Sequence, residues 1–237
     1  MPVDTSIIIP VYNAAGILTD SVHQVIAVMD SFQADYEILL CDDASTDQSG
    51  EALKQLGSQC PRVKSYYNSS NKGLGFTLRR LLKEAKGKNI IYCDCDLPFG
   101  ADVLPVLLKK LENRDIVVAS RYRGASNGTP FARKACSRLY YLLCKLLFHI
   151  PVADIGSGTV AMRRQALKNA DLKADGFDIH VEFYWKMSKQ GARIEEVPVK
   201  FNPNRQKGSF RIWGHGPGVL VKTLKLYCGS LKRVRVQ

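Results

Sequence analysis

The 237-residue sequence predicts an α/β fold, in which a mostly parallel β-sheet is covered by helices on both faces. Apolar runs of strand length alternate with stretches of helical periodicity over the first hundred residues. Two of these apolar runs end in pairs of aspartates. With 46% hydrophobic and 24% charged residues, the composition is that of a folded globular protein rather than a disordered chain. Alternation of this kind requires right-handed crossovers between parallel strands.

The first half of the chain supplies strands and helices in turn. The run "SIIIPVYN" is continuously apolar until Pro10 and Asn13, which suits a strand buried on both faces. Seven apolar residues in "ILTDSVHQVIAVMDSFQ" recur at helical spacing. Gly87 is a C-cap signal for the third helix. We expect strands at residues 6–13, 36–47, 63–68 and 88–96, and helices at 17–33, 49–57 and 73–87.

The second half of the sequence predicts fewer helices and strands than the first. We expect a strand at 114–122, an apolar helix at 137–150, a helix near 180–191 and a strand at 192–201. One domain is expected over residues 1–212, followed by a basic, amphipathic tail over 213–237.

Charge and cysteine content narrow the class of protein. The 34 Lys and Arg against 22 Asp and Glu give a net charge of +12, which favours anionic partners, although a solubilising surface explains it too. The seven cysteines are odd in number and form no Cys-x-x-Cys pair, so we expect a reducing, cytoplasmic compartment. Because no apolar run reaches 18 residues, any membrane contact is expected to be peripheral.

Four acids are expected at one rim of the sheet. Asp42 and Asp43 follow one predicted strand, and Asp94 and Asp96 follow another. In open parallel sheets, ligands bind at the carboxyl ends of the strands. Asp94 and Asp96 can converge on one ion only where the strand ends between them.

The Asp-x-Asp pair predicts a site for a divalent cation. Pro98 and Gly100 supply the break in the strand that this convergence needs. Mg²⁺ and Mn²⁺ are hard cations that take one or two carboxylates together with phosphate oxygens and water. The alternatives are a solvated turn, or soft-metal ligation by Cys93 and Cys95. A closed zinc site needs four donors, and no second Cys/His cluster lies nearby in the sequence.

Taken together, eight segments resemble a known family. In order they are "SIIIPVYN", "ILLCDDASTD", "NKGLGFTLRRLLKEAKG", "IYCDCDL", "VVASRY", "RKACSRLYYLLCKLLF", "DIGSGTVAMRR" and "EEVPVKF". The sequence resembles family 2 glycosyltransferases of the GT-A fold, most closely the dolichyl-phosphate mannosyltransferases, from about residue 4 to 211. The resemblance implies inverting transfer of a sugar, with mannose slightly favoured, from a nucleoside-diphosphate sugar to a polyprenyl or dolichyl phosphate. UDP-glucose or UDP-N-acetylhexosamine donors and a saccharide acceptor stay open.

The resemblance also implies roles for individual residues at the donor site. Asp94 and Asp96 would hold Mg²⁺ or Mn²⁺ on the diphosphate. The residues implied to bind the nucleotide are Pro10, Tyr12, Asn13, Asp42, Asp43 and Asp94. Two positions depart from the family: Ala14 stands where Glu is common, and Pro98 where Gln is frequent.

Further roles follow for phosphate groups and the reaction centre. Asp96, Arg121 and Arg205 are implied in catalysis, and Arg133 and Ser137 in binding the acceptor phosphate. A guanidinium binds phosphate oxygens bidentately and keeps its charge. Asp154 precedes a Ser-Gly segment and has three alternatives: general base, orientation of an arginine, or contact with a sugar hydroxyl.

Two basic, amphipathic segments could lie on the cytoplasmic face of a membrane. These are residues 138–152, whose alternative is a core or dimer helix, and the C-terminal "VLVKTLKLYCGSLKRVRV". Two other classes of protein are less consistent with the sequence. A nucleotidyltransferase would carry a Gly-rich, basic N-terminal loop. A non-enzymatic protein that binds nucleic acid would not need an acidic rim, which repels phosphate, so no nucleic acid is expected as partner.

Overall fold

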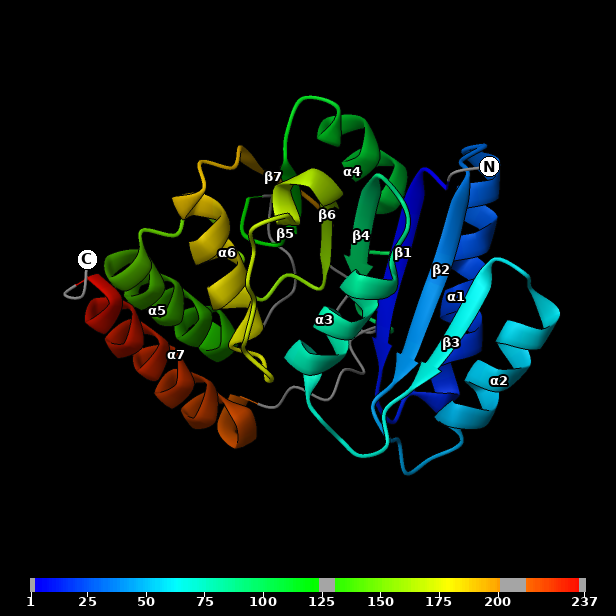
Figure 1. Ribbon diagram of the computed structural model, residues 1–237, viewed down its shortest axis with the longest axis horizontal. Coiled ribbons are helices and arrows are strands. Elements are labelled where there is room, and N and C mark those ends of the chain that lie inside the picture. Colours follow the sequence, from blue (N-terminus) through cyan, green and yellow to red (C-terminus); the bar gives the residue numbers. More distant parts are fainter. Residues whose placement is uncertain (1–2, 124–130, 201–211, 235–237) are drawn as a thin grey trace.

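The computed structural model describes residues 3–123, 131–200 and 212–234. Seven strands form one sheet with the order β3-β2-β1-β4-β6-β5-β7 (Figure 1). The strands are β1 (Thr5–Val11), β2 (Tyr36–Asp42), β3 (Val63–Tyr67), β4 (Asn89–Cys93), β5 (Ile116–Ser120), β6 (Thr159–Arg163) and β7 (Ile194–Pro198). The helices are α1 (Ala15–Ser31), α2 (Ser49–Gln59), α3 (Leu74–Glu84), α4 (Val103–Leu111), α5 (Phe131–Phe148), α6 (Ile179–Lys189) and α7 (Ile212–Val234), with a 3₁₀ turn at Arg164–Leu167.

The predicted α/β fold with a mostly parallel sheet is confirmed. Strand β1 lies between β2 and β4 and is parallel to both. Of the seven described strands, only β6 runs antiparallel, where it pairs with β4 on one side and β5 on the other. The carboxyl ends of β1, β2 and β4 therefore meet at one edge of the sheet.

Two apolar layers cover the sheet, as expected for helices on both faces. Alternate residues of β1 and β2 point to opposite faces, so that Ile7 and Ile38 belong to one cluster, and Ile8 and Leu39 to the other. The first cluster is covered by α1, α2 and α4, and the second by α3, α5 and α6.

Helices α5 and α7 lie side by side at the end of the molecule far from α1 and α2 (Figure 1). The Tyr140 hydroxyl lies 2.8 Å from Thr223 Oγ1, and the ring of Phe148 packs edge-on against that of Tyr227. Within the described ranges, neither these helices nor any other is long and apolar enough to span a bilayer.

Several predicted elements need correction. Helix α3 ends at Glu84, so Gly87 is not its C-cap. Gly87 is needed for close approach instead, since a Cβ there would lie 2.5 Å from the Ser6 backbone nitrogen. Helix α5 begins six residues earlier than expected, at Phe131. Helix α4 and strand β6 were not predicted.

Candidate active site

The loops that follow β1 and β2 are tied together at the carboxyl edge of the sheet. Asn13 has a left-handed backbone (φ 51°). Its Oδ1 accepts hydrogen bonds from the Thr46 backbone nitrogen (2.8 Å) and hydroxyl (3.2 Å). Its own backbone nitrogen donates to Ser45 Oγ at 2.9 Å. Pro10 is half-buried within β1, and Tyr12 beside this junction is 38% exposed, which leaves its ring accessible to a planar ligand.

The two acids at the end of β2 are buried and already hold backbone groups. Asp42 accepts hydrogen bonds from the backbone nitrogen and hydroxyl of Ser45. Asp43 accepts from the backbone nitrogens of Lys72 (2.9 Å) and Gly73 (2.8 Å) and from Asn68 Nδ2 (2.7 Å). Both acids thus shape the loops of the rim, and their predicted contacts with a nucleoside stay predictions.

The Asp-x-Asp pair lies directly beyond β4, which ends at Cys93. A turn closed by the Leu97 backbone nitrogen and the Asp94 carbonyl (3.1 Å) follows, with Leu97 in the left-handed region (φ 41°). The predicted break therefore occurs, but just before Asp94 rather than between the acids. Burial and then the Asp96 carboxylate raise the pKa of Asp94, while the Tyr92 hydroxyl and Arg121 act in the opposite direction. Asp96 is itself buried.

Gly158, on the loop before β6, leaves room for the Asp94 carboxylate. Its carbonyl accepts the Asp94 backbone N–H at 2.7 Å. A Cβ at this glycine would lie 2.2 Å from Asp94 Oδ2, closer than atoms of the two side chains could pack. A residue other than glycine would therefore displace the carboxylate.

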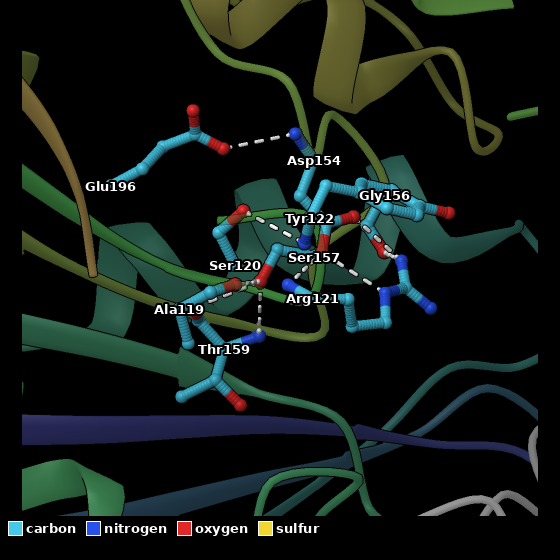
Figure 2. A network of polar contacts seen from close by, with 9 residues as sticks. All are labelled: Ala119, Ser120, Arg121, Tyr122, Asp154, Gly156, Ser157, Thr159 and Glu196. Atoms are coloured by element: carbon cyan, nitrogen blue, oxygen red, sulfur yellow. Dashed lines mark hydrogen bonds and ion pairs between the residues drawn. The ribbon is translucent and has the colours of Figure 1, made fainter. Parts of the chain in front are cut away.

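Arg121 and Asp154 form a buried ion pair beside these acids (Figure 2). Asp154 Oδ2 accepts from the Arg121 backbone nitrogen (2.8 Å) and Nε (2.9 Å), and Oδ1 accepts from a terminal nitrogen (2.7 Å). That nitrogen also donates to the Gly156 carbonyl at 2.9 Å. Burial acts to lower the pKa of Arg121, but the Asp154 carboxylate outweighs it and the pKa is raised. The guanidinium is therefore charged and fixed in orientation.

Glu196 on β7 holds the backbone of Asp154 by a hydrogen bond (Figure 2). Its Oε1 accepts the Asp154 backbone N–H at 3.0 Å, and its Oε2 pairs with Arg123 Nε at 2.9 Å. Ser157 closes the same loop through its hydroxyl, which donates to the Ala119 carbonyl at 2.6 Å. The loop from Asp154 to Gly158 is thus fixed at both ends.

The residues predicted for the acceptor phosphate lie partly outside the described atoms. Ser137 lies half-buried in α5. Arg133 belongs to the first turn of α5, but its side chain is not among those described, and Arg205 lies outside the described residues. The structure therefore brings Asp94, Asp96, Arg121 and Asp154 together. The predicted roles of Arg133, Ser137 and Arg205 stay predictions.

The donor atoms at the end of β4 fit a hard divalent cation. Two carboxylates lie close enough for the charge of Asp96 to raise the pKa of Asp94. Among the described residues, no group of three or more His, Cys, Asp or Glu surrounds a single point. Mg²⁺ and Mn²⁺ suit such a site, because they complete their octahedron with water and phosphate oxygens. The sulfur atoms of Cys93 and Cys95 are buried in the core around α1 and α4.

Sequence reasoning missed Tyr92, Gly158 and Glu196. Tyr92 carried a signal, because residues two apart on a strand share a face and a buried tyrosine hydroxyl usually has a hydrogen-bond partner. For Gly158 and Glu196 the partners are 64 and 42 residues away in sequence, and no local pattern indicates them.

A parallel sheet with one antiparallel strand, and a carboxylate pair beyond β4, define an α/β protein of the GT-A type. The family model described as "Glycosyl transferase family 2" matches residues 6–170, more than half of the chain. The protein therefore belongs to this family.

Individual relatives narrow the comparison. The chain is 30% identical over 216 residues to a dolichol-phosphate mannosyltransferase from Pyrococcus furiosus, and the match covers 88% of this chain but only 59% of that one. Two solved structures share the fold. One is a mannosyltransferase from Pyrobaculum calidifontis in complex with GDP-Man and Mn²⁺, with a TM-score of 0.65 and 19% identity; the match covers 98% of this chain and 65% of that one. The other is a glucosyl-3-phosphoglycerate synthase from Mycobacterium tuberculosis in complex with Mg²⁺ and UDP, with a TM-score of 0.71 and 18% identity; the match covers 96% of this chain and 80% of that one.

Proposed function

We propose that this protein transfers a sugar, with inversion, from a nucleoside-diphosphate sugar to a polyprenyl phosphate at a membrane surface. The observation that carries the proposal is the pairing of two carboxylates beyond β4, the half-buried Asp94 and the buried Asp96, with the charged Arg121 that follows β5. This combination suits a diphosphate bound with a divalent cation. The family and the mannosyltransferase from Pyrococcus furiosus support the same chemistry.

The proposed reaction needs no general base. A phosphate monoester is largely anionic near neutral pH, so its oxygen attacks the anomeric carbon directly while the bond to the nucleoside diphosphate breaks. When bound between Asp94 and Asp96, Mg²⁺ or Mn²⁺ would neutralise charge on the departing diphosphate. Arg121 adds a fixed positive charge on the same side.

The environment of Asp154 favours a phosphate acceptor over a saccharide. A saccharide hydroxyl would need a base, and Asp154 is the first candidate. Its carboxylate is 1% exposed and accepts three hydrogen bonds from Arg121, so it lacks the open approach that a base requires. Orientation of Arg121 is the role that these contacts support.

The first experiment tests donor and acceptor together. The protein is incubated with Mn²⁺ or Mg²⁺, a polyprenyl phosphate, and radiolabelled GDP-mannose, UDP-glucose or UDP-N-acetylglucosamine in separate reactions. Label is then counted in the lipid phase. We expect label from one donor, with GDP-mannose slightly favoured. Absence of lipid label from all three donors, with nucleotide binding intact, would contradict the proposal and direct the search to a saccharide acceptor.

Exposed apolar side chains on α5 and α7 support the membrane contact. Leu139, Leu142 and Leu146 of α5 are 68%, 52% and 76% exposed. Helix α7 adds three more such residues, namely Leu220, Val221 and Leu224. The exposed cations on the same helices include Arg138, Lys145, Lys222 and Lys225. Apolar side chains flanked by cations suit the interface of an anionic bilayer.

Charged substitutions on α5 test this contact. We expect Leu142→Glu with Leu146→Glu to weaken binding to phosphatidylcholine–phosphatidylserine vesicles at least about tenfold, because burial of a leucine side chain contributes about 1.5–3 kcal/mol. Co-sedimentation of the protein with the vesicles measures this binding. Val106→Glu is the matched control, since Val106 is 44% exposed on α4. Equal binding by the double variant and this control would exclude α5 from the membrane contact.

A further inference from the structure

Tyr92 is a buried tyrosine whose hydroxyl donates a hydrogen bond to Asp94 Oδ1. It is 4% exposed, and its ring lies 5.8 Å from that of His180 on α6. The phenolic O–H is the donor in this pair, because a carboxylate oxygen accepts hydrogen bonds. Burial and then Arg121 lower the pKa of His180 to about 4, so the neighbouring ring is neutral at pH 7.

The Asp94 carboxylate is therefore constrained on both oxygens. Oδ1 receives the Tyr92 hydroxyl, and Oδ2 faces Gly158 at a distance that excludes a Cβ. The backbone of Asp94 is held as well, because its N–H donates to the Gly158 carbonyl. Among the described residues, the Tyr92 hydroxyl is the hydrogen-bond donor that fixes the plane of this carboxylate.

Tyr184 provides a natural comparison within the same apolar layer. It lies with Tyr92 and His180 around one small, mostly apolar cavity between α3, α6 and the sheet. It is fully buried, yet its hydroxyl has no hydrogen-bond partner among the described residues. The two tyrosines thus differ in one respect that matters here: only the Tyr92 hydroxyl contacts an acid of the rim.

We propose that Tyr92 is a positioning residue for the metal site, which holds the Asp94 carboxylate in the orientation that binds the divalent cation. The inference rests on the proposed function, because it assigns Asp94 to that cation. Metal-binding carboxylates are commonly held by outer hydrogen bonds, and loss of such a partner typically costs about 10–100-fold in metal affinity or activity. Tyr92 acts through Asp94 and does not itself touch substrate.

The test compares Tyr92→Phe with Tyr184→Phe. Each variant loses one hydroxyl from the same buried layer and keeps the ring. Binding of Mn²⁺ in the presence of GDP or UDP is followed by electron paramagnetic resonance of the free ion. We expect Tyr92→Phe to bind Mn²⁺ about tenfold more weakly than the wild type, and Tyr184→Phe to bind within about twofold of it.

Activity adds a second readout. For Tyr92→Phe, the Mn²⁺ concentration at half-maximal rate should rise about tenfold while the rate at saturating Mn²⁺ is kept. A merely structural loss would lower the rate at every Mn²⁺ concentration. Equal Mn²⁺ affinity of the two variants would overturn the role of Tyr92 alone. Absence of Mn²⁺ and Mg²⁺ binding by the wild type would overturn the proposed metal site and this inference with it.

Discussion

Asp96→Ala is expected to abolish sugar transfer while the protein stays folded. The change removes one of the two carboxylates proposed to hold the divalent cation at the rim, and leaves the apolar layers intact. If the cation contributes about 4 kcal/mol to stabilisation of the transition state, the rate falls by about a thousandfold. The measurement is the transfer rate at saturating donor and Mn²⁺. Retention of half the wild-type rate would contradict the assignment.

We also expect Asp96→Ala not to lower the free energy of unfolding. Most substitutions of buried residues destabilise a protein. Here burial and then the Asp96 carboxylate raise the pKa of Asp94, as expected for two neighbouring like charges that repel each other. Removal of Asp96 relieves this repulsion, so the free energy of unfolding should stay equal or rise by about 1 kcal/mol. Urea unfolding of the variant and the wild type at pH 7 measures this difference in the free energy of unfolding.

Asp102→Ala is the control for Asp96→Ala. Asp102 lies six residues further along the same connection, immediately before α4, and its side chain is exposed. We expect it to keep both activity and stability. Loss of transfer in both variants would indicate that the connection, rather than the Asp96 carboxylate, is required.

The rim of acids could be predicted because it depends on local patterns. Apolar runs of strand length identify β1, β2 and β4, and alternation with helices makes them parallel. Parallel strands end at the same edge, which places Asp42, Asp43, Asp94 and Asp96 there without knowledge of any distance. What the pattern could not show is that Asp42 and Asp43 turn their carboxylates onto Ser45 and onto the loop before α3.

Two elements escaped prediction for different reasons. Helix α4 begins shortly after Pro98 and Gly100 and contains Pro105, so the segment reads as a loop. Pro105 is tolerated because it lies in the first turn, where its missing N–H has no intrahelical acceptor. Strand β6 has only five residues, and a short apolar run does not distinguish strand from helix.

Strand β6 lies between β4 and β5, an arrangement that depends on contacts between residues far apart in the sequence. It forms the part of the site that could not be predicted from the sequence. Antiparallel pairing with β4 brings Gly158 against Asp94, and the loop before β6 brings Asp154 to Arg121, which is 33 residues away. Local signals along the chain identify an arginine and an aspartate, but they do not show that the two residues pair.

Asp154→Ala should destabilise the protein strongly, in contrast to Asp96→Ala. Loss of one partner from a buried ion pair typically costs about 3–5 kcal/mol, because the other charge is left without compensation. Arg121 is only 11% exposed, and Asp154 accepts its backbone N–H as well as its guanidinium. We therefore expect a loss of about 3–5 kcal/mol in the free energy of unfolding, measured with urea, together with loss of transfer.

Two further variants separate orientation of Arg121 from general-base catalysis. Replacement of both partners, as in Arg121→Met with Asp154→Leu, should recover much of the stability, since apolar residues can fill the site without a buried charge, but not the activity. Asp154→Asn keeps oxygen and shape but loses charge. If Asp154 orients Arg121, the Asn variant loses stability and transfer together; a variant of full stability that transfers no sugar would instead assign the base to Asp154.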